Sequence, residues 1–300
     1  MIPEEIRRLA AERQRARATK DFALADSLRD RIRKAGYEIV DTPAGPEPRP
    51  VAEPDRLVHR ASDDVPSLLN SPPAFEFTVQ WVVQGWPQDV ERGIESFRRF
   101  EGGRSVHHVV VEAAGPEEHP WPEGTDVVRM APEAGWAAAR NGALRRCGGA
   151  IVIVVDGSVE ATGDLFGPIA DALADPAVGV TGPFGIVTDD LREFRQSEGP
   201  DVDAVEGYLM AFRRELVERG LRFDEKFTFY RTADIELTFQ VKAMGLRATV
   251  TPLPVTKHEH RMWTNTPEDE RDRLSKRNYY RFLERWRDRT DLLVSRARPG

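Results

Sequence analysis

The sequence of 300 residues contains a single cysteine, Cys147. With no second thiol an intramolecular disulfide is excluded, and a reducing compartment suits the chain. No stretch approaches the roughly 20 consecutive apolar residues that cross a bilayer, and the first residues lack the apolar segment of a signal peptide. We therefore expect a cytoplasmic protein without a membrane span.

An excess of positive charge is also absent. The formal net charge of −7 argues against a whole-protein electrostatic match to nucleic acid and leaves open only a local basic face. Internal repeats are missing too. The hydrophobic residues, 40% of the chain, are enough for a sizeable core. The length predicts either one large domain with a small appendage or two domains.

The first 45 residues predict a small helical hairpin. Two stretches within residues 3 to 35 carry apolar side chains at helical spacing, among them Leu9, Leu28 and Ile32. Residues 46 to 73 follow with many Pro, Asp, Ser and Glu, which is the composition of a linker. The large domain is then expected over residues 74 to 300.

In that domain, short apolar runs alternate with helical patterns, which predicts an α/β fold with a mainly parallel sheet. The run IVIVV at 151 to 155 has no polar alternation, as expected of a central strand covered on both faces. We expect a loop near the ligand over about 186 to 204 and a final helix over about 267 to 290. That helix could form homo-oligomer contacts, although such a stripe more often packs on its own domain.

Asp156 directly follows the IVIVV run, and Gly157 permits a tight turn after it. In parallel α/β sheets ligands bind at the carboxyl ends of the strands, so Asp156 is placed to meet one. A carboxylate there could hold a divalent cation bound to a diphosphate. The alternative is an aspartate that caps the next turn.

An ordered set of motifs carries a family resemblance that spans most of residues 76 to 262: FTVQWVVQGWPQD, VVVEAAG, AARNGAL, VVDGS and TADIELTFQVKAMG. The set resembles family 2 glycosyltransferases. The resemblance implies a GT-A fold, Rossmann-like with flanking helices. It also implies an inverting, hexosyltransferase-like enzyme that moves a sugar from a nucleotide diphosphate sugar to an acceptor that the sequence does not identify.

The resemblance also implies a donor site. Glu112 matches the acidic residue that contacts the base or ribose, and Gln84 and Trp86 lie in the loop that lines the same pocket. Arg140 matches an arginine near the diphosphate, where a fixed cation offsets phosphate charge. The alternatives are a solvated strand end for Glu112 and an exposed helix arginine for Arg140.

Asp156 matches the first aspartate of the family's DxD metal motif, and Ser158 stands where the second is usual. The implied cation is Mn²⁺ or Mg²⁺, held by Asp156, Ser158, His258 and His260. Of the two histidines, His258 is favoured because it lies closer to the preceding strand. Loss of a carboxylate ligand predicts weaker metal binding, unless Ser158, a water or Glu160 compensates. Each histidine could equally be a surface residue.

Asp234 keeps the second acid of the family's Glu-Asp pair, whose first position is Ala233 here. In an inverting transfer a carboxylate removes the proton of the acceptor hydroxyl, so Asp234 is the candidate base. Its alternative is an aspartate favoured by a helix N-terminus. Because both acidic motifs are reduced, a catalytically degenerate sugar-nucleotide-binding protein is the competing hypothesis.

The N-terminal stretch, with its KDFALAD and IVDTPAG phrases, looks like the C-terminal helical end of cysteinyl-tRNA synthetases. The resemblance includes none of the synthetase's catalytic machinery, which excludes aminoacylation. It leaves a module that binds RNA, another protein or the transferase domain, or a charge-rich solvated helix pair, which the composition favours.

Overall fold

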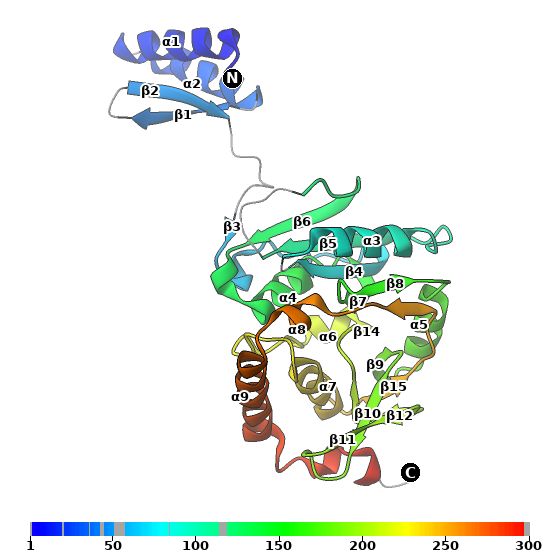
Figure 1. Cartoon of the computed structure of the whole chain (residues 1–300). Coiled ribbons are helices and arrows are strands. Elements are labelled where there is room, and N and C mark those ends of the chain that lie inside the picture. Colours follow the sequence, from blue (N-terminus) through cyan, green and yellow to red (C-terminus); the bar gives the residue numbers. More distant parts are fainter. Residues whose placement is uncertain are drawn as a thin grey trace. The chain divides into compact units, whose positions relative to one another are not determined.

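The structure is a computed structural model that describes residues 2–19, 21–35, 37–42, 45–50, 58–83, 85–113 and 119–296. The chain divides into two compact units, Met1–Leu57 and Val58–Gly300 (Figure 1). The division therefore falls inside the segment 46 to 73 that the composition predicted as a linker.

The first unit contains the two expected helices together with a strand pair that was not expected. Its elements are α1 (Glu4–Ala18), α2 (Phe22–Lys34), β1 (Tyr37–Thr42) and β2 (Gly45–Pro50). The helices bury Ile6, Leu9, Leu28 and Ile32 against each other, and Ile39 of β1 packs on this cluster. Strands β1 and β2 are antiparallel, so part of the predicted linker is a strand.

The second unit is built on a nine-stranded sheet with the order β12-β15-β9-β14-β7-β4-β5-β6-β3. Five of its eight strand pairings are parallel, which confirms the mainly parallel α/β prediction. The strands are β3 (Val58–His59), β4 (Phe75–Val83), β5 (Val106–Glu112), β6 (Thr125–Met130), β7 (Gly149–Val155), β9 (Val178–Gly182), β12 (Asp201–Val202), β14 (Leu209–Arg213) and β15 (Arg247–Val250).

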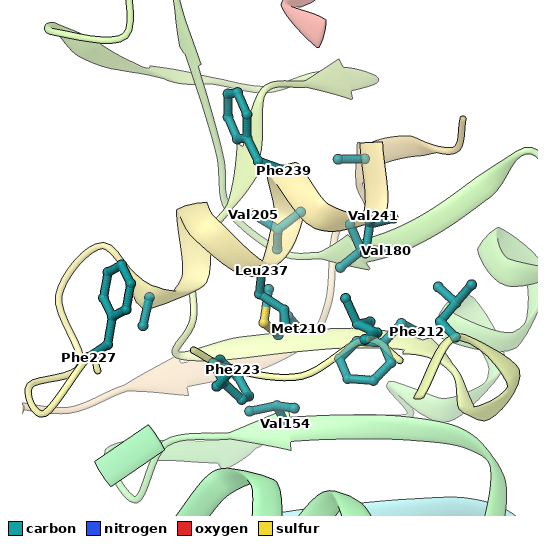
Figure 2. Packing of buried hydrophobic residues seen from close by; sticks show 14 of the residues in the cluster. Val154, Val180, Val205, Met210, Phe212, Phe223, Phe227, Leu237, Phe239 and Val241 are labelled. Carbon is teal, nitrogen blue, oxygen red and sulfur yellow. The ribbon is translucent and has the colours of Figure 1, made fainter. Parts of the chain in front are cut away.

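Strand β7 occupies the centre of this order, as its unbroken apolar run predicted. Its side chains alternate between two hydrophobic clusters: Val152 and Val154 join one, and Ile153 and Val155 join the other. Figure 2 shows the first cluster, where Val154 and Met210 pack beneath Leu237 of α7 (Ala233–Ala243). The sheet is therefore buried on both faces at the point where β7 ends.

Helices cover each face of the sheet. The cluster on one face includes residues of α3 (Pro87–Arg98) and α5 (Phe166–Ala174). The cluster on the other includes residues of α4 (Trp136–Arg145), α6 (Arg214–Glu218), α7 and α9 (Glu268–Trp286). The remaining short helices are α8 (Arg261–Asn265) and the 3-10 turns η2 (Ser62–Asp64), η3 (Pro132–Ala134), η4 (Thr290–Leu292) and η5 (Val294–Arg296).

Short strands make up the segment that was predicted as a loop at 186 to 204. Strand β10 (Gly185–Thr188) pairs with β11 (Phe194–Ser197) and β13 (Ala204–Val205). The loop prediction was therefore wrong there, because the polar and largely exposed residues of β11 resemble loop composition. The late strand also divides, at two prolines, into β15 and β16 (Val255–Lys257), and β16 pairs with β8 (Val159–Ala161).

A search of the described helices finds none whose length and apolar character would allow it to span a lipid bilayer.

Candidate active site

Asp156 follows the last residue of β7 and lies at the carboxyl edge of the sheet. Its backbone N–H donates to the carbonyl of Tyr208 (2.9 Å), and its Oδ1 accepts from the backbone N–H of Ser158 (2.9 Å). Its Oδ2 lies 2.8 Å from Nε2 of His260. Burial raises the pKa of Asp156, but the hydrogen bond and charge of His260, with the backbone hydrogen bond from Ser158, outweigh it and lower the pKa to about 2. Asp156 is thus a fixed anion and also the turn cap of the alternative interpretation.

His260 precedes α8, and its ring is held on three sides. Its Nδ1 accepts from the backbone N–H of Trp263 (3.2 Å), which caps the helix, and the ring lies 4.3 Å from the ring of Tyr230. Because Nδ1 is an acceptor, the proton of the neutral ring sits on Nε2 and points at Asp156. The side chain of His260 is only 18% exposed, so its orientation is fixed by packing.

His258, the histidine that the sequence favoured, points elsewhere. Its Nε2 contacts Glu160 at 2.8 Å, and its side chain is 44% exposed. Glu160 is also paired with Arg92 at 2.5 Å. The structure therefore brings His260, and not His258, against Asp156, and Glu160 is engaged by other partners.

The donor set at Asp156 fits a divalent cation only in part. Ser158 is buried, and its hydroxyl has no hydrogen-bond partner among the described residues. Within the same residues, His, Cys, Asp and Glu side chains nowhere form a group of three or more that could hold a metal ion. Mg²⁺ commonly takes one or two carboxylates and completes its shell with waters and phosphates. Asp156 could hold such an ion only together with a bound diphosphate, and His260 could join it only if its proton moved from Nε2 to Nδ1, which would break the cap to Trp263.

Asp234 is the second residue of α7, so the helix-terminus interpretation is also correct. Its Oδ2 accepts from the backbone N–H of Gly207 (2.8 Å), and its Oδ1 accepts from that of Ile235 (2.9 Å). Burial is the largest influence on its pKa and raises it. Thr232, which caps the helix, has φ 71°, a conformation rare outside glycine that occurs at functional sites. A half-buried carboxylate with a raised pKa is suited to accept a proton.

Arg140 is buried, so the exposed-arginine alternative is wrong. Its guanidinium donates to the carbonyls of Gln80 (3.3 Å) and Val155 (3.0 Å) and lies 5.5 Å from the ring of Trp136. Burial lowers the pKa of Arg140 to about 10, opposed by the charge of Asp156. The Arg140 guanidinium therefore lies inside the fold, where it is bound to the backbone carbonyl of Val155, the residue that precedes Asp156.

The other predicted donor residues are dispersed. Glu112 is buried and accepts from Trp121 Nε1 (2.7 Å) and pairs with Arg129 (2.9 Å), so it is not a solvated strand end. Trp86 lines a small hollow of about 50 Å³ that also includes Asp156, Ser158 and His260. Gln84 lies outside the described residues.

Asp156, His260 and Asp234 line one cavity of about 600 Å³, a volume in the range of small-molecule sites. The rest of its lining consists of Trp136, Ile186, Arg192, Phe194, Glu206, Gly207, Tyr208, Phe223, Tyr230, Arg231, Thr232, Ile235, Lys257, Ser275, Lys276 and Tyr279. Three carboxylates and four cations thus meet in a single cavity with several aromatic rings.

Sequence reasoning missed Glu206 and Lys257. Lys257 Nζ lies 3.4 Å from Glu206 and 4.2 Å from the centroid of the Tyr208 ring. Glu206 precedes β14, and β14 runs antiparallel to β7 with Leu209 opposite Val155, so its start lies at the edge where β7 ends. Only knowledge of that antiparallel pairing would have placed Glu206 beside Asp156.

No protein-family model matches the chain. Its structure resembles a crystal structure of GalNAc-T7 with UDP, GalNAc and Mn²⁺, with a TM-score of 0.60 and 16% sequence identity. The match covers 72% of this chain and 49% of that one, so the chain spans about half the length of the relative. A mannosyltransferase from Pyrobaculum calidifontis in complex with GDP-Man and Mn²⁺ is 23% identical, with a TM-score of 0.47 over 67% of this chain and 64% of its own.

The N-terminal part has different relatives. It is 48% identical over 50 residues to cysteine–tRNA ligase of Chlamydia pneumoniae, and 52% over 42 residues to that of Helicobacter hepaticus. These matches cover 17% and 14% of this chain and 10% and 9% of the ligases, so the chain spans about a tenth of the length of these curated relatives. The larger part of the chain, by contrast, has the fold of GT-A glycosyltransferases.

Proposed function

We propose that the cavity binds a nucleotide diphosphate sugar and that the protein transfers the sugar, with inversion, to an acceptor hydroxyl. The observation that carries the proposal is the meeting of Asp156, His260 and Asp234 in one cavity at the carboxyl edge of a GT-A sheet. Ligands of open α/β sheets bind at that edge. The fold alone does not assign the activity, since one fold hosts many chemistries, so the argument rests on these side chains.

In the proposed reaction Asp234 accepts the proton of the acceptor hydroxyl as the hydroxyl oxygen attacks the anomeric carbon. The bond from that carbon to the diphosphate oxygen breaks, and the nucleoside diphosphate leaves with the electron pair. Burial raises the pKa of Asp234, and the N–H groups of Gly207 and Ile235 fix the orientation of its carboxylate. Glu206 is a second carboxylate of the same cavity, but Lys257 neutralises it, so Asp234 is the stronger candidate.

At the donor end, Asp156 would hold a divalent cation with oxygens of the diphosphate, and His260 would bind the same cation only after its proton moves from Nε2 to Nδ1. When bound, such a cation neutralises charge that develops on the leaving diphosphate. Lys257 adds a fixed positive charge to the same cavity. The chain thus offers two means of charge neutralisation, one of which needs no metal.

The donor site can be tested by calorimetric titration of the protein with UDP, GDP, TDP and ADP sugars, each with and without Mn²⁺. We expect selective binding of one nucleotide that Mn²⁺ strengthens and Asp156→Ala abolishes. The matched control is Asp224→Ala, because Asp224 pairs with Arg281 and lies outside the cavity lining. Absence of binding with every donor would contradict the proposal.

A second candidate function is sugar-nucleotide binding without transfer. It is favoured by the serine at position 158 and by the lack of a three-residue metal group in the described part of the chain. Prolonged incubation with the bound donor separates the two functions. Release of nucleoside diphosphate supports the transferase, and an intact donor supports the binding protein.

For the N-terminal unit we propose a separate binding role, with RNA as the first partner to test. The support is the 48% identity to a cysteine–tRNA ligase over 50 residues. Binding of bulk tRNA that requires residues 1 to 57 and weakens steeply with salt would support the role. Equal binding by a chain that lacks those residues would exclude it.

A further inference from the structure

Three cations of the cavity, Arg192, Arg231 and Lys276, are not used by the proposed donor chemistry, and Arg231 among them lies over the ring of Trp263. Arg192 lies in the turn between β10 and β11, whereas Lys276 lies on α9. The residues assigned to the diphosphate come from other elements, since Asp156 follows β7 and His260 follows β16. The charged residues of one cavity therefore come from different parts of the chain.

Lys276 is exceptional among the basic residues of its own helix. The other five have partners: Arg271 lies on Trp263, Arg273 pairs with Glu270, Arg277 donates to Thr228, Arg281 pairs with Asp224 and Arg285 pairs with Glu236. Lys276 has no ion-pair or hydrogen-bond partner among the residues that the structure describes, and of the six it is the one that lines the cavity. Its charge is thus available to a ligand.

Arg192 is presented in the same way. Asp190 Oδ1 accepts from its backbone N–H (2.8 Å), and Tyr279 Oη donates to the adjacent carbonyl of Leu191 (3.1 Å). Tyr279 lies three residues after Lys276 on α9, so the two side chains share a helix face. The turn is therefore tied to the helix beside Lys276. The guanidinium of Arg192 has no ion-pair partner within the described ranges.

An unsatisfied hydroxyl completes the group. Ser275 lines the cavity, and its Oγ is buried with no hydrogen-bond partner among the described residues, so it reaches a ligand in the cavity after rotation about χ1. A buried hydroxyl without a partner costs free energy unless a ligand or water satisfies it. Two cations and a hydroxyl donor match the charge of nearly −2 and the acceptor oxygens of a phosphate monoester.

We infer that Arg192, Lys276 and Ser275 bind a phosphate monoester on the acceptor, so that the substrate class is a phosphorylated sugar or polyol. This inference rests on the proposed transferase function. The phosphate holds the acceptor at the α9 side of the cavity, and its hydroxyl faces Asp234. A neutral acceptor would leave both cations and the hydroxyl without a partner.

Calorimetry with the full-length protein and saturating nucleoside diphosphate tests the inference, with glucose 6-phosphate and glycerol 3-phosphate as probes. Glucose and glycerol are the neutral counterparts. We expect binding of at least one phosphate probe and no binding of its counterpart. The double variant Arg192→Gln, Lys276→Gln should weaken that binding at least about tenfold, since hydrogen bonds to charged groups contribute about 1.5–3 kcal/mol each.

The control variant is Arg273→Gln, which removes the same charge from the same helix at a side chain paired with Glu270. It should bind phosphate probes as the wild type does. If the nucleotide binds but neither phosphate probe does, the inference is overturned and the transferase proposal stands. If the double variant loses the nucleoside diphosphate instead, the two cations serve the donor and the inference is likewise overturned. Failure of the wild type to bind any nucleotide overturns the proposed function itself.

Discussion

Replacement of His260 by alanine tests whether that ring holds Asp156 in its ionised form. The contact is 2.8 Å long, and the side chain of Asp156 is 21% exposed. The environment lowers the pKa of Asp156 from 3.8 to about 2. At ~1.4 kcal/mol for each tenfold change, that shift corresponds to roughly 2 kcal/mol of stability, and the hydrogen bond and charge of His260 supply the largest favourable part of it.

The sign follows from linkage. A carboxyl group with a lowered pKa stabilises the folded state above its unfolded pKa, and this contribution is lost as the pH falls through the folded pKa. Without His260, burial of Asp156 raises its pKa and the contribution disappears. The difference in unfolding free energy between wild type and His260→Ala should therefore be smallest near pH 2 and grow toward pH 5. Above about pH 5 the difference should become constant. It then consists of roughly 2 kcal/mol from Asp156 and a pH-independent loss of stability from the missing helix cap.

Urea unfolding followed by circular dichroism gives this difference directly. The measurement runs from pH 2.5 to pH 6 in steps of about 0.5 pH units. His258→Ala is the matched control. His258 is 44% exposed, and its partner Glu160 keeps the ion pair with Arg92, so the difference should change little with pH. A difference for His260→Ala that is constant over the whole range would refute the reasoning.

Three further substitutions probe the same cavity. Because burial raises the pKa of Asp234, ionisation of this residue lowers the stability of the folded protein as the pH rises through the folded pKa. In thermal melts, Asp234→Asn should therefore have a higher melting temperature than wild type at pH 8 but not at pH 4. Gly207→Ala would place a methyl group 2.8 Å from Cβ of Asp234 and so displace that side chain. We expect the variant to remain folded but to lose transfer activity about tenfold or more, as measured by nucleotide release. Ser158→Asp adds the missing carboxylate beside Asp156 and should tighten Mn²⁺ binding in calorimetry while it lowers the melting temperature of the metal-free protein through charge repulsion. Unchanged Mn²⁺ affinity in that variant would contradict the placement of the cation.

Much of the fold could be predicted because the signals are local. The unbroken run of β7 predicted a central strand, and its alternating contacts with two clusters confirm it. The strand pair in the first unit was missed because the prolines of Gly45–Pro50 resemble a linker. Strand β11, which follows the turn with Arg192, was missed in the same way, since its polar residues have the composition of a loop.

The site was less predictable, because it depends on pairing across the sheet and on side-chain direction. Asp156 could be found from its place after β7, but the choice between His258 and His260 could not. The ring of His258 contacts Glu160, whereas the ring of His260 contacts Asp156. Arg140 was expected at the diphosphate, whereas its guanidinium is bound to strand carbonyls inside the fold.

The central claim is that Asp234 is the base of a sugar transfer in this cavity. The most direct test measures nucleoside diphosphate release from the donor that binds, in wild type and in Asp234→Asn, alongside donor affinity. The account predicts that the variant binds the donor as wild type does and releases nucleotide about 10² to 10⁴ times more slowly. Release at the wild-type rate by Asp234→Asn would contradict it.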